Sequence, residues 1–163
     1  MVFNFPILLL AALVPMIIGF IWYNPKVFGK AWMEASGMTD EKVKGGNMAL
    51  IFGLSFVFAV LLAFEMQFIV IHQFHLDSIF FGNEAALKDV KAYLDGSQAG
   101  WADNFRTFKH GVLNGTTGGI LFALPILATN AMFERKGLKY VIVNGGYWIV
   151  TLALMGGVIC QFN

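Results

Sequence analysis

Charged residues are scarce in this chain: Asp, Glu, Lys and Arg make up 13% of 163 residues, against roughly 25% in a typical soluble domain. The formal net charge of +1 lacks the basic excess of nucleic-acid-binding proteins, so no nucleic-acid partner is predicted. Cys160 is the single cysteine, which excludes an internal disulfide and a multi-cysteine metal site. Neither a G-x-S-x-G nucleophile motif nor a strand-linked phosphate loop is present. We therefore predict no cofactor.

Hydrophobic residues make up 58% of the chain, and they gather in four long runs. The runs cover about residues 5–23, 48–71, 111–133 and 140–162. A membrane-spanning helix needs about 20 mostly apolar residues, and backbone polar groups in a bilayer must be satisfied within the segment. The sequence predicts an all-α integral membrane protein, a single membrane domain over residues 1–163 with four transmembrane helices in a bundle.

The connection between the second and third runs, about residues 72–110, is the only sizeable polar region. Within it, Glu84 to Leu94 has the pattern of a short amphipathic helix, with apolar residues at Leu87, Val90 and Leu94. We expect this helix to cap the bundle at the membrane surface. The alternative is a gate that faces a substrate.

Basic residues predict the orientation of the chain. The loops at about 24–47 and 134–139 lie on one side and hold seven Lys or Arg residues, whereas the longer connection holds four. Short cytoplasmic loops carry an excess of Lys and Arg. We therefore expect both short loops in the cytoplasm, both termini outside, and the protein in the inner membrane of a bacterium.

The loop after the first run begins with aromatic residues. Trp22, Tyr23 and Trp32 are suited to the headgroup region, where amphipathic rings anchor membrane proteins. The Asn24-Pro25 pair ends the first helix. We interpret this loop as an interfacial re-entry or a short surface helix, with a ligand-binding loop as the alternative.

Several of these motifs resemble one family. They are GFIWYNPKVFGKAW (Gly19 to Trp32), the His110-Gly111 pair, and ALPILATNAMFERKGLK followed by NGGYW (Ala123 to Trp148). Together they resemble the bacterial DUF1761 family, small predicted four-helix membrane proteins without an assigned function. The resemblance covers nearly the whole chain apart from the long connection. It implies a four-helix membrane fold and supplies no reaction, ligand or catalytic residue.

The third run contains a glycine pattern for helix packing. Gly111, Gly115 and Gly119 are spaced four residues apart, with Gly118 alongside. At 100° per residue, Gly111, Gly115 and Gly118 fall within an arc of about 60°. Small residues let helices approach closely in a bilayer. We expect a groove here for a neighbouring helix, which ends where Pro125 bends the run.

Polar side chains within the second to fourth runs are the candidates for a polar interior. An ionised carboxylate at the bilayer centre costs about 2.5–3.5 kcal/mol on insertion scales, and such a residue is by default a functional candidate. The candidates are Glu65, His110, Asn114, Thr117, Asn144 and Thr151.

All three histidines, His72, His75 and His110, fall at the same predicted membrane edge, with Glu65 deeper on the second helix. Imidazole and carboxylate groups are ligands for divalent metals, and histidine also serves in proton relays. Amphipathic rings also gather at interfaces for structural reasons. Metal binding, a proton or ion relay, and a structural role all remain open.

Three functions follow from these residues. In the first, the protein binds or moves a small solute or ion through the polar interior of the second to fourth helices, as a transporter does. In the second, it is a non-catalytic scaffold or accessory subunit. In the third, it is a membrane-embedded enzyme acting on a lipid or quinone with Glu65 and the histidines. The expected partners are the lipid bilayer and a second copy or another membrane protein.

Overall fold

Helix α9 (Leu138–Phe162) lies at the centre of the molecule and contacts α1, α2, α4, α7, η1 and α8. The computed structural model describes residues 4–97 and 100–163. The most apolar stretch of α9 is 56% buried, whereas those of the other three long helices are only 11–22% buried. Small residues on several faces of α9, such as Gly145, Ala153 and Gly156, are buried. They leave room for neighbours all round the helix.

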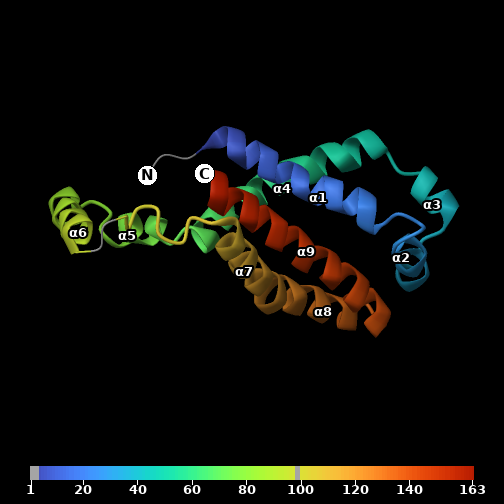
Figure 1. Ribbon diagram of the computed structural model, residues 1–163. Coiled ribbons are helices and arrows are strands. Elements are labelled where there is room, and N and C mark those ends of the chain that lie inside the picture. Colours follow the sequence, from blue (N-terminus) through green and yellow to red (C-terminus); the bar gives the residue numbers. More distant parts are fainter. Residues whose placement is uncertain (1–3, 98–99) are drawn as a thin grey trace.

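The four predicted long helices are confirmed. They are α1 (Phe5–Trp22), α4 (Met48–Val70), the segment Phe108–Phe133, and α9. Each is long and apolar enough to cross a membrane, which indicates a multi-pass membrane protein. Figure 1 shows α1 and α9 side by side, whereas α4 diverges from them toward α3.

The third long segment consists of three pieces: α7 (Phe108–Gly118), a π-helical turn η1 (Gly119–Ala123) and α8 (Leu124–Phe133). Pro125 follows η1 directly within this continuous segment and has no N–H to donate to the preceding turn. A π-helical turn is a common cause of a bend in a helix. The bend predicted at Pro125 is therefore distributed over the preceding turn (Figure 1).

Two short helices, α2 (Gly29–Ser36) and α3 (Asp40–Lys44), join α1 to α4. Gly37 ends α2 in the left-handed region at φ 74°, and the Thr39 hydroxyl accepts from the backbone N–H of Lys42 to begin α3. A short helix therefore follows Asn24-Pro25, and its position at the membrane surface stays a prediction. We call the end of the molecule formed by residues 23–47 and 134–137 the short-loop side.

The opposite end, residues 71–107, is the long-connection side. It holds α5 (Gln73–Ile79) and α6 (Glu84–Ser97). The predicted amphipathic helix is confirmed and is slightly longer, whereas α5 was not expected. None of the described residues of α6 is buried. Figure 1 shows α6 beyond the ends of the long helices rather than across them.

The hydrophobic core lies between α1, α4 and α9, toward the long-connection side. Its side chains include Leu8 and Ala11 of α1, Ala63 and Met66 of α4, and Met155 of α9, all at most 2% exposed. Two of these five residues are alanines, and Ala12 and Ala59 are also buried. Because these side chains are short, α1 and α4 meet closely at this end.

Candidate functional site

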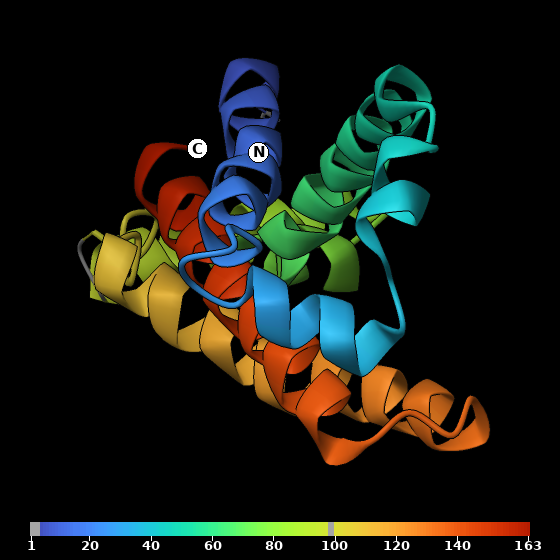
Figure 2. The ribbon, with the colours of Figure 1, turned by 90° about the vertical axis from the view of Figure 1, so that its right-hand side faces the viewer.

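A cavity of about 680 Å³ opens between α1 and α4 on the short-loop side. Figure 2, seen from the end that carries α2 and α3, shows the two long helices separated there. Its walls come from α1, the turn after it, α2, α3, the first third of α4, and α9 through Tyr147. Known ligand sites measure about 300–1,000 Å³. The cavity is therefore large enough for a small molecule.

The turn between α1 and α2 positions one wall of this cavity. The side-chain oxygen of Asn24 accepts a hydrogen bond from the backbone N–H of Lys26 at 2.9 Å. The backbone N–H of Gly29 bonds to the Asn24 carbonyl, also at 2.9 Å. A Cβ added to Gly29 would lie 2.3 Å from the Tyr23 carbonyl oxygen. Only glycine allows this close return of the chain, which brings Trp32 of α2 to the cavity.

Three aromatic side chains fasten α1 to α9 beside the cavity. The Trp22 Nε1–H donates to the Val143 carbonyl at 3.0 Å. The Tyr23 hydroxyl donates to Asn144 Oδ1 at 2.9 Å, and the Tyr147 hydroxyl donates to the Pro15 carbonyl, also at 2.9 Å. Burial, and then the neighbouring Tyr147 and Tyr140, raise the pKa of Tyr23. Tyr23 therefore remains protonated and keeps its role as a donor.

The predicted interface anchors Trp22, Tyr23 and Trp32 are all half-buried. The Tyr23 ring lies 5.4 Å from Trp32 and 5.1 Å from Tyr147, between ring centroids. In the structure these side chains fix the turn and α2 against α9, and their contact with headgroups stays a prediction. Tyr147 was not singled out from the sequence, although the NGGYW motif contains it.

The six polar-interior candidates do not share one space. Asn144 and Thr151 are buried on α9, His110 and Asn114 are half-buried on α7, and Glu65 and Thr117 are exposed. None of these six residues lines the cavity between α1 and α4. The Thr117 hydroxyl donates to the Leu113 carbonyl of its own helix at 2.9 Å, so this side chain can face lipid without an unsatisfied donor.

Glu65 lies on the face of α4 that turns away from the core. The buried face of this helix consists of Ala59, Ala63, Met66, Gln67 and Val70. Glu65 has no hydrogen bond or ion pair with any residue that the structure describes. Its sequence spacing to His72 suggested a shared face, but α4 ends at Val70 and His72 follows the turn at Ile71.

The three histidines lie at one end of the molecule, as predicted, and two of them touch. His72 Nε2 lies 2.9 Å from His110 Nε2, and the Asn114 side-chain nitrogen is also 2.9 Å from His110 Nε2. The His75 ring is 6.3 Å from that of His72, between centroids. Within residues 4–97 and 100–163, no group of three His, Cys, Asp or Glu side chains could hold a metal ion. The arrangement fits a contact between α7 and the short turn that joins α4 to α5.

The predicted glycine groove packs against α9, with one correction. A Cβ on Gly111 would lie 2.2 Å from the Gly156 carbonyl oxygen, and one on Gly115 would lie 2.1 Å from that of Leu152. A Cβ on Gly119 would meet the Ile149 Cα at 2.7 Å. Gly118 has no atom within 4 Å of its Cβ position. The groove therefore follows the row with a spacing of four, and Gly118 lies outside it.

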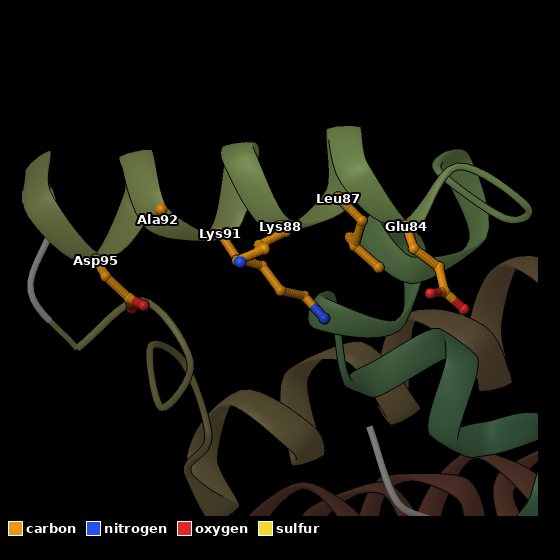
Figure 3. A pocket seen from close by; sticks show the side chains of 6 residues that line it. All are labelled: Glu84, Leu87, Lys88, Lys91, Ala92 and Asp95. Atoms are coloured by element: carbon orange, nitrogen blue, oxygen red, sulfur yellow. The ribbon is translucent and has the colours of Figure 1, made fainter.

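A second hollow, of about 400 Å³, lies along α6. Figure 3 shows its six lining residues, from Glu84 to Asp95. Lys91 forms an ion pair with Asp77 at 2.6 Å, and Asp95 accepts from the Trp101 indole at 2.5 Å. Four of the six residues are charged, with both signs, and none is buried. This hollow is a solvated surface rather than an enclosed site.

Comparison with protein families adds one identification. Residues 7–160 match the model described as a protein of unknown function, DUF1761. The chain belongs to this family. The comparison with curated proteins and the comparison with solved structures each return no match. Membership in DUF1761 confirms the resemblance seen in the motifs. The cavity lining includes Gly19, Tyr23, Asn24, Pro25 and Trp32, which belong to the first of those motifs.

Proposed function

We propose that this DUF1761 protein binds an amphipathic small molecule in the cavity between α1 and α4. The observation that carries the proposal is a space of about 680 Å³ with mostly apolar walls and a few polar groups near its short-loop end. Ligand sites typically combine such walls with a few polar groups that orient the ligand. The sequence predicted a small-solute site among the polar residues of α4, α7 and α9. We now propose that the site is this cavity instead.

The depth of the cavity supports an amphiphile from one leaflet. Its wall along α1 and the residue that ends it runs from Pro15 to Tyr23. At 1.5 Å per residue this stretch spans about 12 Å, close to half of the ~30 Å hydrocarbon core. A molecule with an apolar chain and a polar head matches both the depth and the position of the polar groups.

Side access is supported by the exposure of the lining residues. Phe20 of α1 is 82% exposed and Phe52 of α4 is 56% exposed, and both line the cavity. Such apolar surface in a membrane protein faces lipid, so a ligand can enter sideways from the bilayer. From the excess of basic residues in the short loops, we place the short-loop side in the cytoplasm and the protein in the inner membrane.

A second candidate function is a scaffold within a membrane complex. Helix α4 favours it, because the most apolar stretch of this helix is only 11% buried. A second copy or another membrane protein would cover this face. In this reading, the occupant of the space between α1 and α4 is a protein helix rather than a small molecule.

Native mass spectrometry of the protein released from phosphatidylcholine nanodiscs tests the proposed function. The probes are lysophosphatidylglycerol and lysophosphatidylcholine with the same acyl chain. We expect the wild type to retain at least one probe, at one molecule per chain. Ser55→Phe should reduce retention at least about tenfold, because Ser55 lines the cavity and the added ring would fill it.

Val57→Phe is the matched control, since Val57 is 52% exposed on the same helix and lies outside the cavity lining. It should retain the probe as the wild type does. If no probe is retained, or if both variants retain it equally, the amphiphile-binding function is wrong. A stable dimer that Ser55→Phe dissociates would support the scaffold instead.

A further inference from the structure

We infer that the head group of the bound amphiphile is anionic and lies at the end of the cavity formed by Asn24, Trp32 and Lys42. This inference rests on the proposed function and adds the chemical class of the ligand. The three side chains come from the turn after α1, from α2 and from α3, and all three line the cavity. They lie at the short-loop end, where a head group at the membrane surface would be.

The charges of the lining support an anion. Among the described residues that line the cavity, Lys42 alone is charged, and none is acidic. Lys42 Nζ has three N–H donors, of which one bonds weakly to the Gly37 carbonyl at 3.3 Å. The remaining donors are available to a phosphate or carboxylate group.

Two further side chains add N–H donors. The side-chain oxygen of Asn24 is occupied by the Lys26 N–H, so the amide nitrogen is the free end of that group. The Asn24 amide nitrogen and the Trp32 Nε1 have no hydrogen-bond acceptor within the described part of the chain. Neutral donors beside a cation form the kind of set that binds oxyanions through charge-assisted hydrogen bonds.

The nearby acidic side chains do not cancel this preference within the cavity. Glu34 is paired with Lys139 at 2.5 Å. Asp40 and Glu41 are exposed on α3 and are not among the lining residues. Of the residues of α3, Lys42 and Val43 line the cavity.

The size of the cavity favours a ligand with a single acyl chain. At about 680 Å³ it falls in the range of sites that hold one drug-sized molecule. The apolar chain would lie between Met16 and Phe20 of α1 and Ile51 and Phe52 of α4, which all line the cavity. An anionic amphiphile with one acyl chain matches both the polar and the apolar end of the cavity. Examples are a fatty acid and a lysophospholipid with a phosphoglycerol head.

Competition between the two lysolipids in phosphatidylcholine nanodiscs tests this inference. With matched acyl chains, the wild type should retain lysophosphatidylglycerol about tenfold more strongly than lysophosphatidylcholine. Both heads offer a phosphate, but lysophosphatidylcholine also carries a trimethylammonium group, which the Lys42 ammonium repels. Lys42→Glu should remove or reverse this preference, and Lys42→Gln should weaken it.

Lys44→Glu provides the matched control, because it makes the same change of charge on the same helix but at a residue that does not line the cavity. It should keep most of the preference. Equal retention of both lysolipids by the wild type, or equal loss in the Lys42→Glu and Lys44→Glu variants, overturns the anionic head group while leaving amphiphile binding intact. Retention of neither lysolipid overturns both proposals.

Discussion

The α7–α9 interface and the α1–α4 pair show how two contacts between apolar helices can differ. Along α7, glycines at Gly111 and Gly115 place backbone against backbone, and a Cβ at either would lie about 2 Å from a carbonyl oxygen of α9. Helices α1 and α4 meet in this close manner only at the alanine-rich end near the long-connection side. Toward the short-loop side, the large side chains of Met16, Phe20, Ile51 and Phe52, together with Gly19 and Ser55, line a cavity. Rows of small side chains allow close contact between helices in a membrane, whereas the ends of α1 and α4 that carry bulky side chains enclose a cavity.

The largest expected effect is on the closed interface. Gly115→Ala should lower the stability of the protein by about 1–3 kcal/mol, because the new methyl group would lie 2.1 Å from the Leu152 carbonyl oxygen and must push α7 away from α9. Gly19→Ala is the matched substitution beside the cavity, where the Cβ would lie 3.6 Å from the Tyr147 hydroxyl in ordinary contact. It should be neutral or stabilise by up to about 1 kcal/mol through helix propensity.

Thermal unfolding of the detergent-solubilised variants, followed by intrinsic fluorescence, measures this difference. If both alanine variants shift Tm by the same amount, the contrast between a closed and an open contact is wrong. Gly118→Ala offers a second reference on α7 itself, since no atom lies within 4 Å of its Cβ position.

A smaller effect is expected just beyond the closed end of α4, where His72, in the turn before α5, meets His110 of α7. Burial, and then the charges of His110 and His75, lower the pKa of His72 below its ordinary value of 6.5. The folded state therefore binds this proton less readily than the unfolded chain. The contribution of His72 to the free energy of unfolding should be greatest above pH 6.5. It should decrease as the pH falls below that value and level off beneath the lowered pKa of His72.

His72→Gln should flatten this part of the pH profile of Tm, whereas His75→Gln should change it less because no hydrogen bond joins the described His75 side chain to His110. A His72→Gln profile as steep as that of the wild type would show that the contact between these two histidines does not set the pH dependence.

The sequence predicted the helices well, because long apolar runs are local signals. It also predicted the glycine groove, since the spacing of Gly111 and Gly115 places both on one face of any regular helix. Gly118 was assigned wrongly because the arc calculation assumed a regular helix in isolation. The path of α9 across α7 selects Gly111, Gly115 and Gly119 instead.

The candidate site was harder to predict, because it depends on how distant segments meet. Tyr147 reaches the cavity from α9, more than 120 residues after Tyr23, to which its ring packs at 5.1 Å. In the sequence, Lys42 is one of several basic residues of the same loop. Only the fold of α3 shows that Lys42 lines the cavity and that Lys44 does not. Glu65 was a candidate because a carboxyl group is rare in an apolar run. In the structure it lies outside the buried face of α4.

A density map of the protein in phosphatidylcholine nanodiscs with added lysophosphatidylglycerol would test the central claim most directly. We expect an elongated density between α1 and α4, with its broader end beside Lys42, and no such density between α7 and α9. A map in which α1 and α4 close along their whole length, or in which a helix of a second copy fills the space, would contradict it.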